Sequence, residues 1–270
     1  MHIKNSVIIV TGASAGIGRA TAVALANLGA VVVVTARRGG RLQTLAAEMA
    51  NSSGRIHPFP GDIRDEAFCH QLVAETVTQY GRLDVLINNA GLGHKSQIAE
   101  MPAADIRTIF DTNVLGLLYA TQAAVPPMKK QGGGQIINVS SIISQRPIPY
   151  GGIYTASKTA VNFLSRTLRM ELRPYNIKVT LVYPGRTQTE FGDALLGQKG
   201  ANPSAFGRTS PDKVARAIVK AIRYGRTEVY VTPFDWLFAH ANRLFPRTTD
   251  WLTNFVFNRY LNQKSDKIEE

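Results

Sequence analysis

Short, mainly apolar runs alternate with longer segments of helical periodicity along most of the chain. The apolar runs cover residues 7–10, 31–34, 56–59, 85–87, 136–139, 179–182 and 229–231. Helical spacing of apolar positions is clearest over residues 17–28, 41–49, 68–80 and 156–171. Strands that are apolar on both faces belong in a parallel sheet that helices cover on each side. The pattern therefore predicts an α/β fold with a single Rossmann-type, doubly wound parallel sheet and helices on both faces.

Two stretches interrupt this alternation. Residues 186–210 are rich in glycine, alanine, serine and threonine, a composition that indicates a mobile segment. Residues 233–260 hold both tryptophans, and apolar positions recur there at helical spacing on both sides of Pro246, which predicts two short amphipathic helices. We therefore expect residues 1–232 to form one domain and residues 233–270 to form a C-terminal helical extension that is not an independent domain. Elsewhere, Pro126-Pro127 predicts a loop.

Three roles fit the C-terminal extension. Its apolar faces suit packing as ordinary core against the domain or against a second subunit. It follows the main domain directly, so it also suits a lid over a binding site. Contact with a membrane surface is the third role, because arginines lie among the aromatic residues, namely Arg223, Arg226, Arg243, Arg247 and Arg259. The sequence does not choose between these roles.

Composition and charge exclude a few classes of protein and of site. Of the 270 residues, 44% are hydrophobic and 19% are charged, as in globular proteins and unlike disordered chains. The single cysteine, Cys69, excludes an internal disulfide and a cysteine-based zinc cluster, which favours a reducing compartment such as the cytoplasm. The chain has 31 Lys and Arg against 19 Asp and Glu, a net charge of +12. These basic residues are scattered, so we expect no nucleic-acid partner and favour an anionic ligand or a membrane surface.

The first apolar run leads directly into a glycine-rich turn, and a helical segment follows it. The turn contains Gly12, Gly16 and Gly18 within residues 11–18. Glycines let a backbone turn sharply and approach a pyrophosphate closely, and the N-terminus of the following helix offers free amides and a positive dipole. A strand, this turn and a helix in succession predict a dinucleotide-binding site.

The second apolar run ends at the position that selects between the two nicotinamide dinucleotides. An acidic residue there would bind the ribose 2′-hydroxyl of NAD, and residues 31–47 contain none. Arg37 and Arg38 stand there instead. Guanidinium groups pair well with phosphate, so this pattern predicts NADP (NADPH) as the cofactor. A solvated strand end is the alternative interpretation of the two arginines.

Further motifs complete a recognisable set. In chain order they are Asn88-Asn89-Ala90-Gly91, Asn113, Ser141, Tyr154 with Lys158 four residues later, and Pro184-Gly185. With the glycine-rich turn, this order and spacing resemble the classical short-chain dehydrogenase/reductase family over about residues 5–232. The resemblance implies a nicotinamide-dependent oxidoreductase.

The resemblance also implies that Asn113, Ser141, Tyr154 and Lys158 are the catalytic residues. Tyr154 and Lys158 share one face of a predicted helix, so we expect the ammonium group, together with the positive charge of the oxidised nicotinamide, to lower the pKa of Tyr154 and to favour its phenolate. Tyr154 would exchange a proton with the substrate oxygen, and Ser141 would polarise that oxygen. In the family, the counterpart of Lys158 also binds the nicotinamide ribose, and that of Asn113 anchors a water that relays protons. Ser140 is a rival of Ser141 for its role.

The family pattern carries a set of cofactor contacts over to this sequence. The implied cofactor-binding residues are Gly12, Ser14, Gly16, Ile17, Gly18, Arg37, Arg38, Asp62, Ile63, Asn89, Ala90, Gly91, Tyr154, Lys158, Pro184, Gly185, Thr187 and Thr189. Asp62 would touch the adenine, and Thr187 stands where the family commonly has an aliphatic residue that contacts the cofactor through its backbone. No metal is implied, because the five histidines are scattered without metal-ligand spacing.

Together these features predict an NADP(H)-dependent enzyme that transfers a hydride between nicotinamide and a carbonyl or secondary alcohol. The aromatic extension makes a lipophilic small-molecule substrate a hypothesis, and the resemblance implies a homo-oligomer, either a dimer or a tetramer. A nucleophile elbow is absent from the sequence, which argues against a hydrolase. Two alternatives stay open: an NADP-binding regulator or scaffold without turnover, and a peripheral membrane protein that acts through its C-terminal extension.

Overall fold

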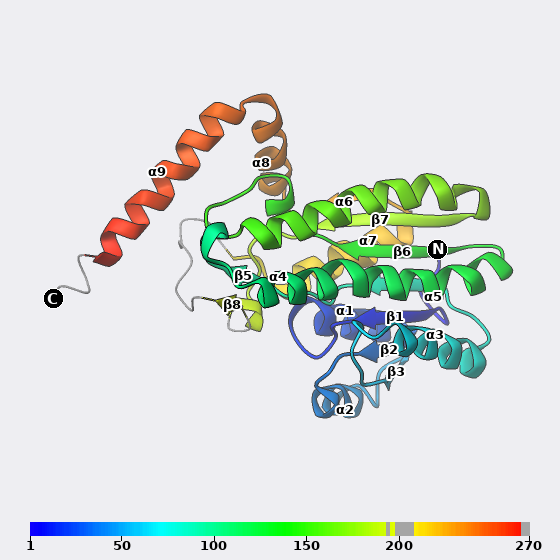
Figure 1. Cartoon of the computed structure of the whole chain (residues 1–270). Coiled ribbons are helices and arrows are strands. Elements are labelled where there is room, and N and C mark those ends of the chain that lie inside the picture. The colour runs from blue at the N-terminus through cyan, green and yellow to red at the C-terminus, as the bar shows by residue number, and fades with distance from the viewer. Residues whose placement is uncertain (193–194, 198–207, 266–270) are drawn as a thin grey trace.

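A seven-stranded parallel sheet forms the centre of the computed structural model, which describes residues 1–192, 195–197 and 208–265. The strand order is β3-β2-β1-β4-β6-β7-β9 (Figure 1). The strands are β1 (Val7–Thr11), β2 (Val31–Thr35), β3 (Arg55–Pro58), β4 (Val85–Asn88), β6 (Gly134–Val139), β7 (Ile177–Tyr183) and β9 (Glu228–Tyr230). Nearly every residue of β1, β2, β4, β6 and β7 is buried, so the predicted Rossmann-type fold is confirmed.

Helices cover both faces of the sheet, and each face has its own apolar core. One face carries α1 (Gly16–Asn27), α2 (Gly39–Glu48) and α7 (Pro211–Tyr224). The other face carries α3 (Glu66–Tyr80), α5 (Gly116–Lys130) and α6 (Gly152–Leu172). The chain reverses its winding between β1 and β4, and the carboxyl ends of the strands around such a reversal are where doubly wound folds bind ligands.

Helix α4 (Ala103–Phe110) continues through one π-helical turn, Asp111–Leu115, directly into α5. The loop expected at Pro126-Pro127 is wrong, because both prolines lie inside α5. Met128 is fully buried in the core, and the backbone N–H of Gln131 donates to the carbonyl oxygen of Pro127. Packing and this hydrogen bond continue the helix past the two missing N–H groups.

Shorter elements surround the carboxyl edge of the sheet. Strands β5 (His94–Lys95) and β8 (Leu196–Gly197) pair in parallel beside it. Single 3-10 turns are formed by Ile98–Glu100, Ile142–Ser144, Arg173–Tyr175 and Glu190–Gly192. Of the predicted mobile segment 186–210, residues 193–194 and 198–207 lie outside the described residues, so its mobility stays a prediction.

The C-terminal extension forms two helices on either side of residue 245, α8 (Pro233–Leu244) and α9 (Pro246–Ser265), and α9, with 20 residues, is longer than the short helix that the sequence predicts. Thr232 and Asp235 cap the start of α8 reciprocally. The buried guanidinium of Arg146 then holds the extension, because it donates to Asn242 on α8 at 2.7 Å and to Asp250 on α9 at 2.6 Å. Helix α9 reaches away from the sheet (Figure 1). Within the described part of the chain, none of the helices combines the length and apolar character needed to span a bilayer.

Candidate active site

The glycine-rich turn leaves the carboxyl end of β1 and forms a tight cradle. Gly12 and Gly16 have φ angles of +67° and +57°, which favour glycine. A Cβ on Gly12 would lie 2.7 Å from the Cα of Ala90, and a Cβ on Gly18 would lie 2.4 Å from the carbonyl oxygen of Gly12. The turn therefore packs directly against the Asn89-Ala90-Gly91 segment. Helix α1 begins without a side-chain cap, so its first amides face this cradle unpaired by a capping residue.

Thr11, which sequence reasoning passed over as a functional residue, joins the two sides of the cradle. Its hydroxyl accepts hydrogen bonds from the backbone N–H groups of Asn89 and Ala90, both at 3.0 Å. The Asn89 side-chain amide donates back to the carbonyl oxygens of Thr11 and Gly12 at 3.0 and 3.2 Å. These four bonds lock the carboxyl ends of β1 and β4 together. A buried threonine at a strand end gives no distinctive sequence signal.

The two arginines after β2 have different surroundings. Arg38 donates from Nε and Nη2 to the hydroxyl of Ser14, at 3.2 and 2.9 Å, so it lies over the glycine-rich turn. Arg37 is exposed and acts electrostatically on Asp62, whose pKa its charge helps to lower. Thus the structure brings Arg38 into contact with Ser14, whereas Arg37 lies close enough to Asp62 for its charge to act on that carboxylate.

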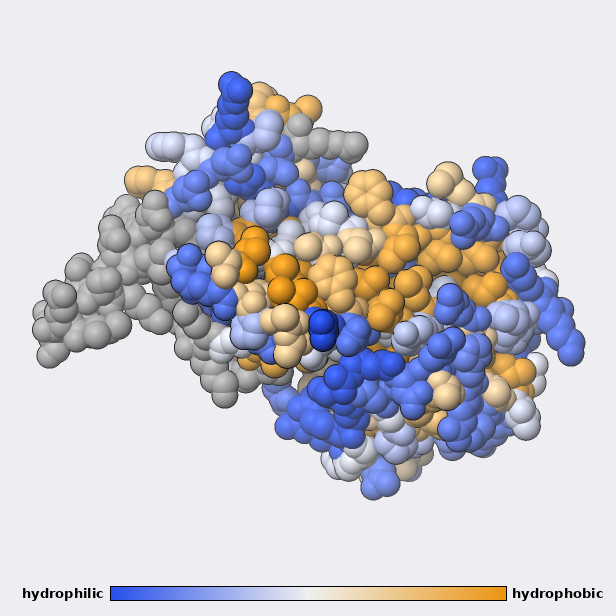
Figure 2. Space-filling view, in the orientation of Figure 1, coloured by the Kyte–Doolittle hydropathy of each residue, from blue (hydrophilic) through white to orange (hydrophobic). Residues whose placement is uncertain are grey.

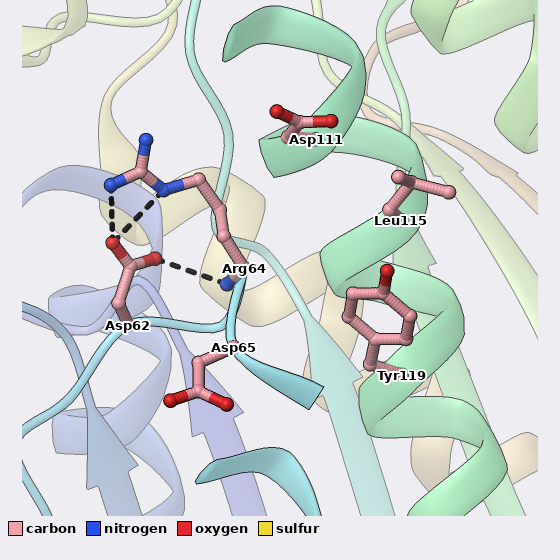
Figure 3. Close-up of a pocket in the computed structure, with 6 residues that line it drawn as sticks. All are labelled: Asp62, Arg64, Asp65, Asp111, Leu115 and Tyr119. Carbon is pink, nitrogen blue, oxygen red and sulfur yellow. Dashed lines mark hydrogen bonds and ion pairs between the residues drawn. The ribbon is translucent and has the colours of Figure 1, made fainter. Parts of the chain in front are cut away.

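Asp62 lies at the edge of a pocket of ≈ 480 Å³ (Figure 3). Its carboxylate accepts hydrogen bonds from the backbone and side chain of Arg64, at 2.6 to 3.0 Å. Burial works in the opposite direction, but these bonds hold the pKa of Asp62 below its usual value. Across the pocket, Figure 3 shows Asp111, Leu115 and Tyr119 from the π-helical turn and α5. Ile63 is buried and packs against the start of α5, so its side chain supports this wall.

Tyr154 and Ser141 meet beside the carboxyl end of β6. Tyr154 lies in the first turn of α6, and its hydroxyl shares a side-chain hydrogen bond with Ser141, which follows β6 in extended conformation. The rival Ser140 points elsewhere: its buried hydroxyl donates to Asn162 at 2.6 Å. Asn162 in turn donates to Ser144, whose hydroxyl donates to the carbonyl oxygen of Ser141. Ser141 is therefore the serine that faces Tyr154, and no motif in the sequence indicates the network of hydrogen bonds behind it.

Lys158 and Asn113 lie next to Gly91, which follows β4. A Cβ on Gly91 would be 3.1 Å from Oδ1 of Asn113 and 3.3 Å from Nζ of Lys158. Lys158 is buried and donates to the carbonyl oxygen of Val139 at 2.9 Å. Asn113 sits in the π-helical turn and donates to the backbone of Leu92 and to Ser157, both at 2.9 Å. The structure thus gathers all four predicted catalytic residues at one place.

The protein chain by itself does not lower the pKa of Tyr154. Burial raises the pKa of the Tyr154 hydroxyl to about 12, and the hydrogen bond with Ser141 opposes this only in part. Burial also lowers the pKa of the Lys158 ammonium to about 8. Desolvation outweighs the charge effect expected from the i, i+4 spacing. The tyrosine is therefore a protonated phenol at neutral pH, a state that can donate a proton.

The segment after β7 crosses in front of the cradle. The Pro184-Gly185 turn is anchored by the backbone N–H of Ile142, which donates to Pro184 at 2.9 Å. Thr187 bonds locally to the carbonyl oxygen of Gly185 at 3.0 Å. Thr189 lies over the turn, since a Cβ on Gly16 would be 2.9 Å from its methyl group. Beyond it, the ring of Phe191, which sequence reasoning missed, lies 5.6 Å from the ring of Tyr154.

These residues fit a nicotinamide dinucleotide. The cradle has no room for Cβ atoms at Gly12 and Gly18, the uncapped helix offers amides to a diphosphate, and Arg38 lies over the turn. Ile17 differs from its neighbours, because its side chain packs against the apolar core and leaves only its backbone for a ligand. Among the described residues, histidine, cysteine and carboxylate side chains form no group of three or more that could hold a metal ion.

Comparison with known proteins gives the same result. Residues 6–199 match the family model of the short chain dehydrogenases. The chain is 34% identical over 269 residues to an 11-beta-hydroxysteroid dehydrogenase-like protein of Arabidopsis thaliana. The alignment covers 97% of this chain and 85% of the relative. An alcohol dehydrogenase from Thermococcus sibiricus complexed with 5-hydroxy-NADP has a TM-score of 0.74 at 28% identity, over 84% of this chain and 96% of that one.

A second solved structure shares the fold at lower sequence identity. It is a short chain dehydrogenase/reductase from Burkholderia phymatum in complex with NAD, with a TM-score of 0.83 at 24% identity, over 92% of this chain and 96% of that one. This second likeness shows the shared fold, and the family match supports a nicotinamide cofactor without selecting NAD or NADP. From its family match, its sheet and its assembled site, the chain belongs to the short-chain dehydrogenase family of oxidoreductases.

Proposed function

We propose that the protein reduces a carbonyl group to a secondary alcohol, or runs the reverse reaction, with NADP(H) as its cofactor and Tyr154 as its acid and base. The hydrogen-bonded pair of Tyr154 and Ser141 carries this proposal, since Lys158 and Asn113 stand beside it at the cofactor cradle. Bound NADPH would supply the hydride. Tyr154 would donate its proton to the substrate oxygen, and Ser141 would hold and polarise that oxygen.

In the direction of reduction, Tyr154 would act as the proton donor. Because burial raises the pKa of Tyr154 to about 12, its hydroxyl holds a proton throughout the neutral range. A carbonyl oxygen that receives a hydride becomes an alkoxide and needs that proton.

Replacement of Tyr154 by phenylalanine tests the reaction. Tyr154→Phe removes only the hydroxyl, so we expect NADPH binding to persist and turnover of a carbonyl panel to fall by at least about a hundredfold, as for removal of a general acid. A regulator or scaffold that binds NADP without turnover would consume no NADPH with any carbonyl in wild type. That result would contradict the proposed activity.

Arg38 and the absence of a competing acidic residue over 31–47 support NADP over NAD. Fluorescence titration of NADPH and NADH against wild type and Arg37→Ala/Arg38→Ala tests this choice. We expect wild type to bind NADPH more tightly, and the double variant to bind it only as tightly as NADH. Equal binding of both cofactors by wild type would mean that the enzyme uses either one.

An apolar wall beside Tyr154 supports a lipophilic substrate. A Cβ on Gly93 would lie 2.4 Å from a methyl group of Leu195 and 2.8 Å from the ring of Phe191, whose ring also faces Tyr154. These side chains favour a hydrophobic group next to the reacting carbonyl. Turnover of small polar ketones but of no hydrophobic ones would refute this substrate class.

Exposed apolar residues on α6 support a homo-oligomer, a dimer or a tetramer. Phe163 and Met170 are 65% and 70% exposed, and they lie two helical turns apart on one face. Figure 2 shows apolar side chains gathered over α5 and α6. Light scattering after size exclusion tests the assembly, and a monomer at micromolar concentration would contradict it.

The C-terminal extension supports a second candidate, peripheral membrane contact. Trp236, Trp251 and Phe255 are each more than half exposed on α8 and α9. Aromatic side chains of this kind suit the headgroup region of a bilayer. Flotation with anionic liposomes, compared between the full chain and a chain ending at Thr232, tests this role, and equal flotation would refute it.

A further inference from the structure

Glu190 forms an ion-paired bridge at the mouth of the cofactor cradle. Its carboxylate accepts a hydrogen bond from Nη1 of Arg38 at 3.1 Å and pairs with Nη1 of Arg41. The residues lie 152 and 149 positions apart in the sequence, so the bridge joins the segment after β7 to the start of α2. Arg38 meanwhile keeps its bonds to Ser14. One carboxylate thus occupies two guanidinium groups at the carboxyl end of β2.

The ion-paired bridge lies at the carboxyl end of β2, next to the glycine-rich turn. The carboxyl end of β2 is where a doubly wound fold meets the adenosine ribose, and an arginine there accommodates a 2′-phosphate. Arg38, which donates to Glu190, also donates to Ser14 in the glycine-rich turn. Glu190 therefore presents its anionic group beside the cradle, where the phosphate of NADP would bind.

We infer that Glu190 competes with the 2′-phosphate of NADP for Arg38 and Arg41, so that this carboxylate weakens NADP binding and narrows the preference over NAD. The inference rests on the proposed use of NADP. It also adds Arg41 to the residues that select the cofactor. NADH has no 2′-phosphate, so its binding does not require the two guanidinium groups to be released.

We expect Glu190 to compete only weakly and reversibly with the 2′-phosphate for the two arginines. The side chains of Arg38, Glu190 and Arg41 are 51%, 51% and 49% exposed, and water weakens such pairs. A phosphate brings close to two negative charges and three acceptor oxygens, so it forms more charge-assisted bonds with two arginines than one carboxylate does. NADP should therefore displace Glu190, at a loss of about two- to fivefold in affinity, as for one exposed ion pair.

The neighbour of Glu190 connects this bridge with the catalytic side of the cleft. Glu190 and Phe191 share one 3-10 turn, and the Phe191 ring packs against that of Tyr154. The hydroxyl of Thr189 accepts the Phe191 backbone N–H at 3.3 Å and keeps the turn together. Displacement of Glu190 thus acts on the segment that contacts the catalytic tyrosine.

Charge removal at Glu190 tests the inference directly. The probes are NADPH, NADH and 2′-AMP, titrated against the full-length protein and its Glu190→Gln variant at one fixed ionic strength. The matched control is Glu171→Gln, which removes the same charge from an exposed position about 25 Å along α6 from Tyr154. We expect Glu190→Gln to bind NADPH and 2′-AMP about two- to fivefold more tightly, with NADH affinity and both control affinities unchanged.

A double-mutant cycle separates competition from a general field effect. In an Arg38→Ala/Arg41→Ala background, Glu190→Gln should no longer tighten NADPH binding. Unchanged or weaker NADPH binding by Glu190→Gln, or equal tightening of NADPH and NADH, would overturn the inference while leaving the wild-type preference for NADPH in place. A wild type that binds NADH as tightly as NADPH would instead overturn the proposed cofactor, and the inference with it.

Discussion

Gly18 has no room for a Cβ atom, so its replacement by alanine tests the close packing of the cofactor cradle. Its backbone has an ordinary φ angle, so only space restricts it. A Cβ there would lie 2.4 Å from the carbonyl oxygen of Gly12 and 2.5 Å from the side-chain nitrogen of Asn89. That nitrogen holds the turn by donating to the carbonyl oxygens of Thr11 and Gly12. We predict that Gly18→Ala destabilises the fold and opens the cradle.

The free-energy cost follows from two contributions. The added methyl group must move its neighbours by close to an ångström, and such overpacking costs about 1–3 kcal/mol. Displacement of the Asn89 amide weakens two hydrogen bonds, which adds about 1 kcal/mol. The sum of about 2–4 kcal/mol corresponds to a fall in Tm of roughly 5–15 °C for a chain of this size. NADPH affinity should fall by about tenfold or more, because the amides that meet its diphosphate shift.

Thermal unfolding by circular dichroism and NADPH titration measure the two effects. The matched control is Gly40→Ala in α2, since no described atom lies within 4 Å of a Cβ built there. We expect the control to keep NADPH affinity and to gain up to about 1 kcal/mol from helix propensity. A Gly18→Ala protein with the wild-type Tm and the wild-type NADPH affinity would refute the close packing described for the cradle.

Two further predictions concern buried charges. Burial lowers the pKa of Lys158 from 10.5 to about 8, so the unfolded chain binds more protons between these values. The stability of wild type relative to Lys158→Met should therefore rise by about 2 kcal/mol from pH 7 to pH 9.5, which urea unfolding measures, and a constant difference would contradict the buried ammonium. Arg146→Ala removes the guanidinium that holds α8 and α9, so chymotrypsin should cut the extension several times faster while the sheet domain stays intact. Equal cleavage of wild type and variant would show that other contacts anchor the extension.

The sheet could be predicted from the sequence because β1, β2, β4, β6 and β7 are buried along nearly their whole length. Each apolar run, such as residues 31–34 or 136–139, became a strand within a residue or two. Runs of this kind have one favourable place, inside a parallel sheet. The prolines of α5 mislead because local propensity favours a turn, while the buried Met128 keeps the helix in place.

The catalytic group could be predicted because its members lie in recognisable motifs, yet its electrostatics could not. The i, i+4 spacing of Tyr154 and Lys158 brings the two side chains together but does not show how much water surrounds them, and desolvation decides both pKa values. The partners of Glu190 were hidden for a different reason. Contacts across about 150 residues arise only from the folded arrangement, and an exposed glutamate carries no local signal.

The transfer of a labelled hydride tests the central claim most directly. NADPH carrying deuterium at the transferable C4 position is incubated with wild type and a panel of hydrophobic ketones and aldehydes, and the alcohols are weighed by mass spectrometry. We expect at least one alcohol to gain a single deuterium at its carbinol carbon with wild type, and Tyr154→Phe to form it at least about a hundredfold more slowly. Tight NADPH binding by wild type without deuterium in any product would contradict the proposed reductase.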